Sequence, residues 1–235
     1  MGTDTGSGEE EIKEIQTSLD IEHHSLREPF FCRKYAQPIM LAVAIAAFNQ
    51  LSGINALIYY TKHIFEMAGA GSQSALLQAV IIGFTNLAFT MAALLVIDHF
   101  GRKRLMLVGS IGYILSLGIT AWAFYTDTGG MVVLAILLVF IASHAFGQGA
   151  VMLVFVSEIF PNRVRARGQA LGCFTHWFMA AVISWTFPMI AATSGGHAFA
   201  FYAICMVAQL VWVLWLMPET KKITLEQLQK KFEID

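Results

Sequence analysis

The side chains best suited to bind a ligand are amides and aromatics that lie within otherwise apolar segments. One segment reads Phe48-Asn-Gln-Leu-Ser-Gly-Ile-Asn-Ala-Leu-Ile-Tyr-Tyr60, and Asn86, Gln148 and His176-Trp177 follow in later segments. Amides offer both donors and acceptors, which suits a neutral ligand with many hydroxyls, and flat aromatic rings suit the C–H faces of a sugar. For any one amide alone, hydrogen bonding between helices is an alternative explanation, worth about 0.6–2 kcal/mol.

The spacing of these residues constrains the helix that carries them. Asn55 and Tyr59 are four residues apart and share one helical face. Gln50 and Asn55 are five apart, so about 140° separates them on an ideal helix. Both can face one ligand only if the helix bends or breaks between them, and Ser52-Gly53 lies at that point. Broken helices are frequent at transporter sites, while close helix packing is the alternative explanation for Gly53.

The elements that must position these residues are about six apolar stretches. Each has the roughly 20 residues that a helix needs to cross about 30 Å of hydrocarbon. With 57% hydrophobic and 13% charged residues, the chain is far from the roughly 25% charged residues of soluble proteins. We therefore predict an all-α membrane protein with six transmembrane helices. The stretches are 37–61, 74–97, 105–125, 131–157, 168–193 and 197–217.

The positions of the basic residues predict the orientation of the chain. All of the 15 Lys and Arg except Lys62 fall before the first stretch, after the sixth, or in alternate connections. Lys and Arg accumulate in cytoplasmic loops. We therefore expect six crossings of the plasma, or bacterial inner, membrane with both termini in the cytoplasm. The polar and acidic residues 1–25 do not resemble a secretory signal.

The pattern divides the chain into three parts. Hydrophobic residues at helical spacing in 11–19 predict a short amphipathic helix, and the same spacing recurs between Leu225 and Phe232. We expect a cytoplasmic linker with that helix over 1–36, the six-helix bundle over 37–217, and a cytoplasmic tail helix within 218–235.

Composition excludes several other classes of protein. A net charge of −1 gives no reason to expect nucleic acid as a partner. Cys32, Cys173 and Cys205 fit neither a disulfide framework nor a zinc site. No nucleophile–base pair or metal cluster is recognisable, so we expect no enzyme, metal or cofactor. The stretches lack carboxylates and ammonium groups at depth, which argues against a self-contained proton path and leaves His144 and His176 as titratable candidates.

Read together, these residues resemble the sugar porter family of the major facilitator superfamily. The resemblance covers about residues 30–235, and only the C-terminal six-helix half of a twelve-helix transporter. It therefore implies a complementary N-terminal six-helix half as a partner. The segments that carry it are Asn49-Gln-Leu-Ser-Gly-Ile-Asn55, Tyr59-Tyr60, Asp98-His-Phe-Gly-Arg-Lys-Arg104, Ser157-Glu-Ile-Phe-Pro161 with Arg165 and Gly168, and Pro218-Glu-Thr-Lys221.

The resemblance also implies which residues contact a sugar. Three positions depart from the family's usual pattern: Asn49 replaces a Gln, His176 stands where an amide is common, and Leu153 stands where a sugar-stacking Trp is usual. The implied substrate-binding residues are Asn49, Gln50, Asn55, Tyr59, Asn86, Gly149, His176 and Trp177.

A second set of residues is implied to control access to the site. Tyr59 and Tyr60 match tyrosines at an extracellular gate. Charged residues at the cytoplasmic ends of helices match ion pairs that hold that side together when the transporter opens outward. The same charges would also act as topology determinants, and both roles can hold. This charged set is Asp98, Arg102, Lys103, Glu158 and Arg165.

The resemblance implies transport of a neutral hexose or pentose by alternating access, with this chain as one half or a fragment of a full transporter. Uniport and symport both stay open. One alternative is a non-transporting membrane remnant that acts as a scaffold or sensor. Another is a half-size transporter that works as a homodimer, because the two halves of this superfamily are related by an axis along the membrane normal.

Overall fold

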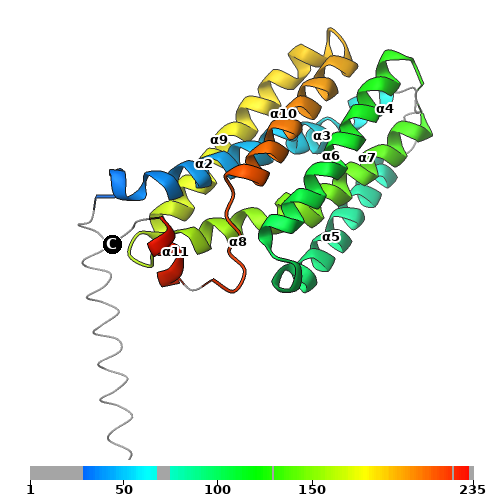
Figure 1. Ribbon diagram of the computed structural model, residues 1–235. Coiled ribbons are helices and arrows are strands. Elements are labelled where there is room, and N and C mark those ends of the chain that lie inside the picture. Colours follow the sequence, from blue (N-terminus) through cyan, green and yellow to red (C-terminus); the bar gives the residue numbers. More distant parts are fainter. Residues whose placement is uncertain (1–28, 68–74, 129, 224, 233–235) are drawn as a thin grey trace, which may run out of the picture.

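The computed structural model is a bundle of long tilted helices (Figure 1). It describes residues 29–67, 75–128, 130–223 and 225–232. Within these ranges every regular element is helical, and six helical spans are long and apolar enough to cross a membrane. The predicted all-α, six-span architecture is therefore confirmed. The spans are Arg33–Tyr59, Ala79–Phe100, Arg102–Tyr125, Val132–Ile159, Arg165–Ala191 and Gly195–Trp215.

Several spans are built from more than one helical element. The first consists of η1 (Arg33–Tyr35), α2 (Ala36–Leu51) and α3 (Ile54–Tyr59), with α4 (Thr61–Met67) following it. The fourth consists of α7 (Met131–His144), the π-helical η3 (Ala145–Gly149) and α8 (Ala150–Ile159). The others are α5 (Ala75–Phe100), α6 (Arg102–Tyr125), α9 (Arg165–Ala191) and α10 (Gly195–Trp215), and a short α11 (Leu225–Lys231) ends the described chain.

The interior is formed by two groups of packed apolar side chains along the length of the bundle. One group, which includes Tyr113, Phe140 and Phe187, lies around α3, α6, α7, α9 and α10. The other includes Met106 and Phe155 and lies around η1, α2, α6 and α8. Within this framework α6 packs along α10, and α2 packs along α9.

The close approach of α6 and η3 depends on a pair of glycines. A Cβ atom on Gly109 would lie 3.0 Å from the Cα of Gly147, and the converse distance is also 3.0 Å. Such distances are tighter than ordinary van der Waals contact, so a side chain at either position would push the two backbones apart. The glycines therefore set the separation at which side chains of α6 can reach η3.

Two helices present long apolar faces outward. The most hydrophobic windows of the α5 and α9 spans are only 17% and 22% buried, against 61% for the first span. The exposed face of α9 includes Phe174, Phe178 and Trp185. An apolar face of this length has to contact lipid tails or other membrane helices, because exposed apolar patches of this size mark membrane or protein contacts.

Near the C-terminus, α11 packs against α8, and Leu228 and Phe232 are buried in the second apolar group. Figure 1 shows α11 at the same end of the bundle as η1 and the start of α2. The amphipathic helix expected in 11–19 lies outside the described residues. The side of the membrane on which α11 lies stays a prediction.

Candidate functional site

The first span breaks between α2 and α3, at Ser52-Gly53. Gly53 has φ 83° and ψ 12°, the left-handed conformation that favours glycine. A Cβ on Gly53 would lie 2.5 Å from the Tyr202 ring, so the position has no room for a side chain. The Ser52 hydroxyl donates to the Asn49 carbonyl at 2.6 Å and accepts from the Ile54 N–H at 3.3 Å. These bonds satisfy backbone groups that the break leaves without helical partners.

The break brings the two amides of the first span together. Asn55 Nδ2 donates to Gln50 Oε1 at 3.0 Å, so two amides that would lie about 140° apart on an unbroken helix meet across the break. Gln50 Nε2 donates to Asn49 Oδ1 at 3.2 Å and lies 3.1 Å from either ring nitrogen of His176. Asn49, Gln50, Asn55 and His176 thus form a continuous chain of polar contacts from α2 and α3 to α9, which we call the amide cluster. Asn49 and Gln50 are buried, whereas Asn55 is half-buried.

Trp177 lies beside the amide cluster and is open on one side. Its ring packs edge-on against the His176 ring, with centroids 5.2 Å apart. Its side chain is nevertheless 63% exposed. The arrangement therefore offers a flat apolar surface next to hydrogen-bonding groups, which is the combination that a hydroxylated ring can use.

Two further predicted residues line a separate groove. Tyr59 and Asn86 face a cavity of about 470 Å³ between α3, α4 and α5, together with Lys62 and Ile141. Gly149, the last residue of η3, is exposed and packs against His144, where an added Cβ would lie 3.2 Å from the carbonyl oxygen. The structure thus joins four of the eight predicted binding residues by hydrogen bonds and places Trp177 beside them. The roles of all eight in binding stay predictions.

Tyr60, in contrast, contacts α9. Its hydroxyl donates to the Ser184 carbonyl at 3.0 Å, and its ring lies 5.2 Å from the Phe187 ring. The adjacent Tyr59 is 58% exposed. The two neighbouring tyrosines therefore differ: one fixes the top of α3 against α9, and the other is free to meet a ligand or a facing surface.

A separate buried polar network was not identified by sequence analysis. The Tyr113 hydroxyl donates to Gln148 Oε1 at 3.0 Å and lies 2.6 Å from His144 Nδ1. A hydroxyl has one proton to donate, so the His144 ring N–H must donate to Tyr113. Gln148 Nε2 donates to Gln209, whose own amide donates to Ser110 at 2.8 Å. Every member of the network has a hydrogen-bond partner, and these bonds connect α6, η3 and α10.

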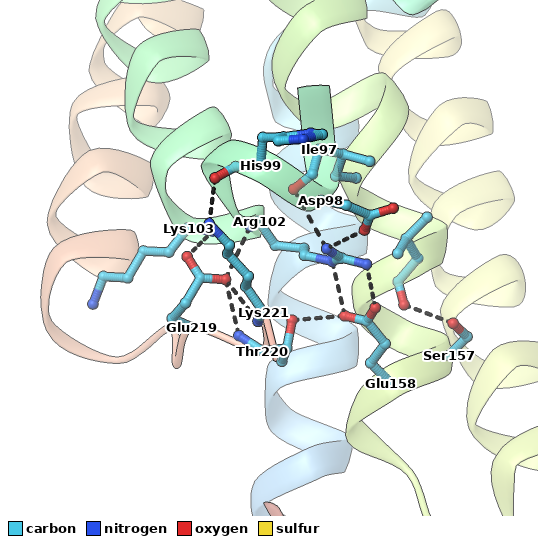
Figure 2. A network of polar contacts seen from close by, with 11 residues as sticks. Ile97, Asp98, His99, Arg102, Lys103, Ser157, Glu158, Glu219, Thr220 and Lys221 are labelled. Atoms are coloured by element: carbon cyan, nitrogen blue, oxygen red, sulfur yellow. Dashed lines mark hydrogen bonds and ion pairs between the residues drawn. The ribbon is translucent and has the colours of Figure 1, made fainter. Parts of the chain in front are cut away.

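A second set of predicted residues gathers where α5 and α8 end and α6 begins (Figure 2). Arg102 donates through Nη2 and Nε to the two carboxylate oxygens of Glu158, at 2.6 and 3.1 Å. Its Nη1 donates to Asp98 at 2.8 Å. Paired bonds between a guanidinium and a carboxylate are stronger than a single neutral bond. Arg102 is buried, so this pairing satisfies a charge that would otherwise be unfavourable.

Glu219 extends this network, although its role was not predicted. Its carboxylate accepts from the backbone N–H groups of Arg102 at 3.0 Å and Lys103 at 3.2 Å, the first two residues of α6. It also accepts from the N–H groups of its neighbours Thr220 and Lys221. A helix N-terminus favours an anion because its first N–H groups lack helical partners. Glu219 therefore caps α6 from a segment more than a hundred residues away.

Two details bind that cap to the ion pairs. The Thr220 hydroxyl donates to Glu158 Oε2 at 2.6 Å, so the chain after α10 contacts α8 as well as α6. Gly101, before α6, has φ 91°, and a Cβ there would lie 2.5 Å from Glu219 Oε2. The sequence signal was the segment Pro218-Glu-Thr-Lys221, which was recognised without roles for Glu219 and Thr220.

Lys103 and Arg165 stand apart from the ion pairs. Lys103 joins Glu219 only through its backbone, and Figure 2 shows its side chain leading away from the carboxylates, where Nζ donates to the Leu214 carbonyl at 3.0 Å. Arg165 lines a cavity of about 380 Å³ with Asp98 and Glu158. Its Nε is buried and has no hydrogen-bond partner within the described part of the chain.

Comparison with known proteins shows extensive similarity to sugar transporters. The family model described as "Sugar (and other) transporter" matches residues 3–232. The D-xylose-proton symporter of Escherichia coli (strain K12) is 36% identical over 203 residues, which are 83% of this chain and 41% of that protein. The arabinose-proton symporter of Bacillus subtilis (strain 168) is 31% identical over 223 residues, 94% of this chain and 48% of that protein.

Solved structures agree. The major facilitator proton:xylose symporter bound to 6-bromo-6-deoxy-D-glucose superposes with a TM-score of 0.80 at 33% identity, over 95% of this chain and 48% of that chain. The chain thus spans about half the length of the relatives that it matches.

Proposed function

Because the chain belongs to the sugar (and other) transporter family of the major facilitator superfamily, we propose that it transports a neutral monosaccharide by alternating access. Members of this family are transporters and not enzymes. In this proposal the chain supplies one six-helix half and works with a complementary N-terminal half. The observation that carries the proposal is the amide cluster across the α2–α3 break, with the exposed Trp177 ring beside it.

The chemistry of the cluster supports a neutral, hydroxylated substrate. Asn55 uses one N–H on Gln50, which leaves its carbonyl oxygen and second N–H to meet sugar hydroxyls. Gln50 is held in place by Asn49 and His176. Preorganised groups of this kind bind with a smaller ordering penalty than free side chains. Trp177 would contact the apolar face of the ring.

The relatives support a pentose or hexose as the substrate. Two of them are named for proton symport of xylose and arabinose, and a proton:xylose symporter was solved with 6-bromo-6-deoxy-D-glucose bound. The described carboxylates Glu66, Asp98, Asp127, Glu158 and Glu219 all lie at or beyond helix ends. A proton-coupling carboxylate at mid-membrane depth would therefore come from the complementary half. Both proton symport and facilitated diffusion are compatible with this proposal.

The proposed orientation places both termini in the cytoplasm of a plasma or inner membrane. The basic residues gather at the end of the bundle that carries Arg102, Arg165 and α11. In this orientation the network of Arg102, Glu158 and Glu219 holds the inner ends of α5, α6 and α8 together when the transporter opens outward. The apolar faces of α5 and α9 then meet lipid and the complementary half.

Half-length coverage also favours a second candidate, a membrane scaffold or sensor that does not transport. Transport tests discriminate between the two. The chain is co-expressed with the N-terminal half of the E. coli D-xylose-proton symporter, and xylose binding to the purified pair is measured by calorimetry. Reconstitution of the same pair in liposomes tests saturable uptake, and the chain alone is expected to give none.

The site is tested by removing single amides in the paired halves. Asn55→Ala is expected to weaken sugar binding about tenfold, because a lost bond is worth about 0.5–1.5 kcal/mol and about 1.4 kcal/mol corresponds to tenfold. Gln50→Ala is expected to weaken it as well, because Asn55 loses the buried partner that holds it in place. Asn162→Ala removes an exposed amide after α8 and serves as the matched control. Unchanged affinity in both site variants refutes the proposed site. A loss of melting temperature with unchanged affinity would identify the amides as packing residues.

A further inference from the structure

A groove separate from the amide cluster runs between the start of α2 and the end of α10. Its volume is about 880 Å³, within the roughly 300–1,000 Å³ typical of pockets that hold one small molecule. None of the amide-cluster residues lines it. The lining residues are Arg33, Lys34, Ala36, Gln37, Met40, Leu41, Ala44, Trp212, Leu216 and Phe232.

The rest of the groove is largely apolar. Met40 on α2 and Leu216 after α10 line it and are 66% and 64% exposed. Trp212 on α10 lines it and packs on the Phe48 ring, with centroids 5.7 Å apart. Phe232, after α11, also lines it and is buried. A groove of this volume with mainly apolar lining side chains suits a hydrocarbon chain.

The end of the groove formed by Arg33 and Lys34 is positively charged. Arg33 and Lys34 are the charged residues among the ten that line it, and none of the ten is acidic. Lys34 Nζ lies 5.7 Å from the centroid of the Tyr35 ring, at the base of α2. Lys230 and Lys231 are exposed at the end of α11, directly before Phe232. In the proposed orientation this end faces the cytoplasmic leaflet, where anionic lipids attract basic residues near the surface.

We propose that this groove binds one anionic phospholipid, with its phosphate at Arg33 and Lys34 and one acyl chain between α2 and α10. The bound lipid would bridge the first and last membrane spans and the α11 helix at their common end. Charge complementarity selects the headgroup, and the apolar wall of Met40, Trp212 and Leu216 holds the chain. The inference uses the proposed orientation but no property of the sugar site, so either one can fail alone.

Native mass spectrometry of the delipidated chain tests this inference. Dioleoylphosphatidylglycerol and dioleoylphosphatidylcholine are titrated separately, and the occupancy of the first bound lipid is compared. Each cation near an anionic headgroup contributes about fivefold, so we expect phosphatidylglycerol to be preferred about thirtyfold. The double variant Arg33→Gln/Lys34→Gln should lose most of that preference. The control Arg104→Gln/Arg163→Gln removes two exposed charges elsewhere on the same end and should keep it.

A second variant tests the apolar wall. Ala44 is half-buried in the groove. Ala44→Phe should fill the groove and lower phosphatidylglycerol occupancy about tenfold without loss of melting temperature. Equal binding of the two lipids, or equal losses in the two charge variants, would overturn the proposal. Full competition by sn-glycerol 3-phosphate would also overturn it, because it would show that the site binds only the anionic headgroup. Binding seen only after deletion of residues 1–28 would assign the groove to that segment instead.

Discussion

Removal of the Glu219 carboxylate should release the start of α6. The N–H groups of Arg102 and Lys103 are the first of the helix, where no helical partner exists, and both donate to Glu219 at 3.0 and 3.2 Å. Loss of an N-terminal cap costs about 0.5–2 kcal/mol, and bonds to a charged acceptor lie at the upper end of such ranges. We therefore expect Glu219→Ala to destabilise this local structure by about 2 kcal/mol.

Hydrogen–deuterium exchange of the chain in nanodiscs measures this local opening. A change of about 2 kcal/mol corresponds to about thirtyfold faster exchange of the Arg102 and Lys103 amides. Glu219→Gln keeps one acceptor oxygen and loses the charge, so it should have a smaller effect. Glu66→Ala is the control, because Glu66 pairs with Lys62 at 3.7 Å in an exposed contact that contributes about 0.2–0.5 kcal/mol. Unchanged protection at the start of α6 in Glu219→Ala would refute the capping role.

Three further substitutions test other parts of the structure, each by the melting temperature of the purified chain. Gly53→Ala should destabilise the chain by about 2 kcal/mol or more, because φ at Gly53 is 83° and the new Cβ would meet the Tyr202 ring. Gly118→Ala is the control and should be harmless, because a Cβ there would have nothing within 4 Å. Equal effects of the two substitutions would contradict this account of the α2–α3 break. Glu158→Gln should cost about 3–5 kcal/mol, because it leaves the buried Arg102 guanidinium without its paired carboxylate. Asp98→Asn should cost less than about 1 kcal/mol, because the Asp98 side chain is 78% exposed. A larger loss of stability in Asp98→Asn than in Glu158→Gln would show that Asp98 is the main partner. Tyr113→Phe should cost about 1–3 kcal/mol, since His144 and Gln148 lose their partner, and an unchanged melting temperature would mean that the network does not stabilise the bundle.

Local sequence patterns determined the six membrane spans and the break in the first one. A span is recognisable because its length and apolar composition are properties of consecutive residues. The angle between Gln50 and Asn55 on an ideal helix indicated that both could face one ligand only if the helix bent or broke at Ser52-Gly53, and the helix breaks there. The positions of the Lys and Arg residues likewise predict an orientation without reference to packing.

Tertiary packing decided which polar groups meet. The contact of Gln50 with His176, the cap of Glu219 on α6, and the link from Tyr113 to Gln148 and Gln209 all join residues far apart in the sequence. Helical periodicity gives the face of a residue but not the neighbour that packs there. The family resemblance implied an ion pair for Lys103, and its ammonium group instead donates to a backbone carbonyl of α10. The partners of a buried polar group are fixed by the separation and rotation of whole helices. Those in turn depend on close contacts such as Gly109 against Gly147, which no single segment contains.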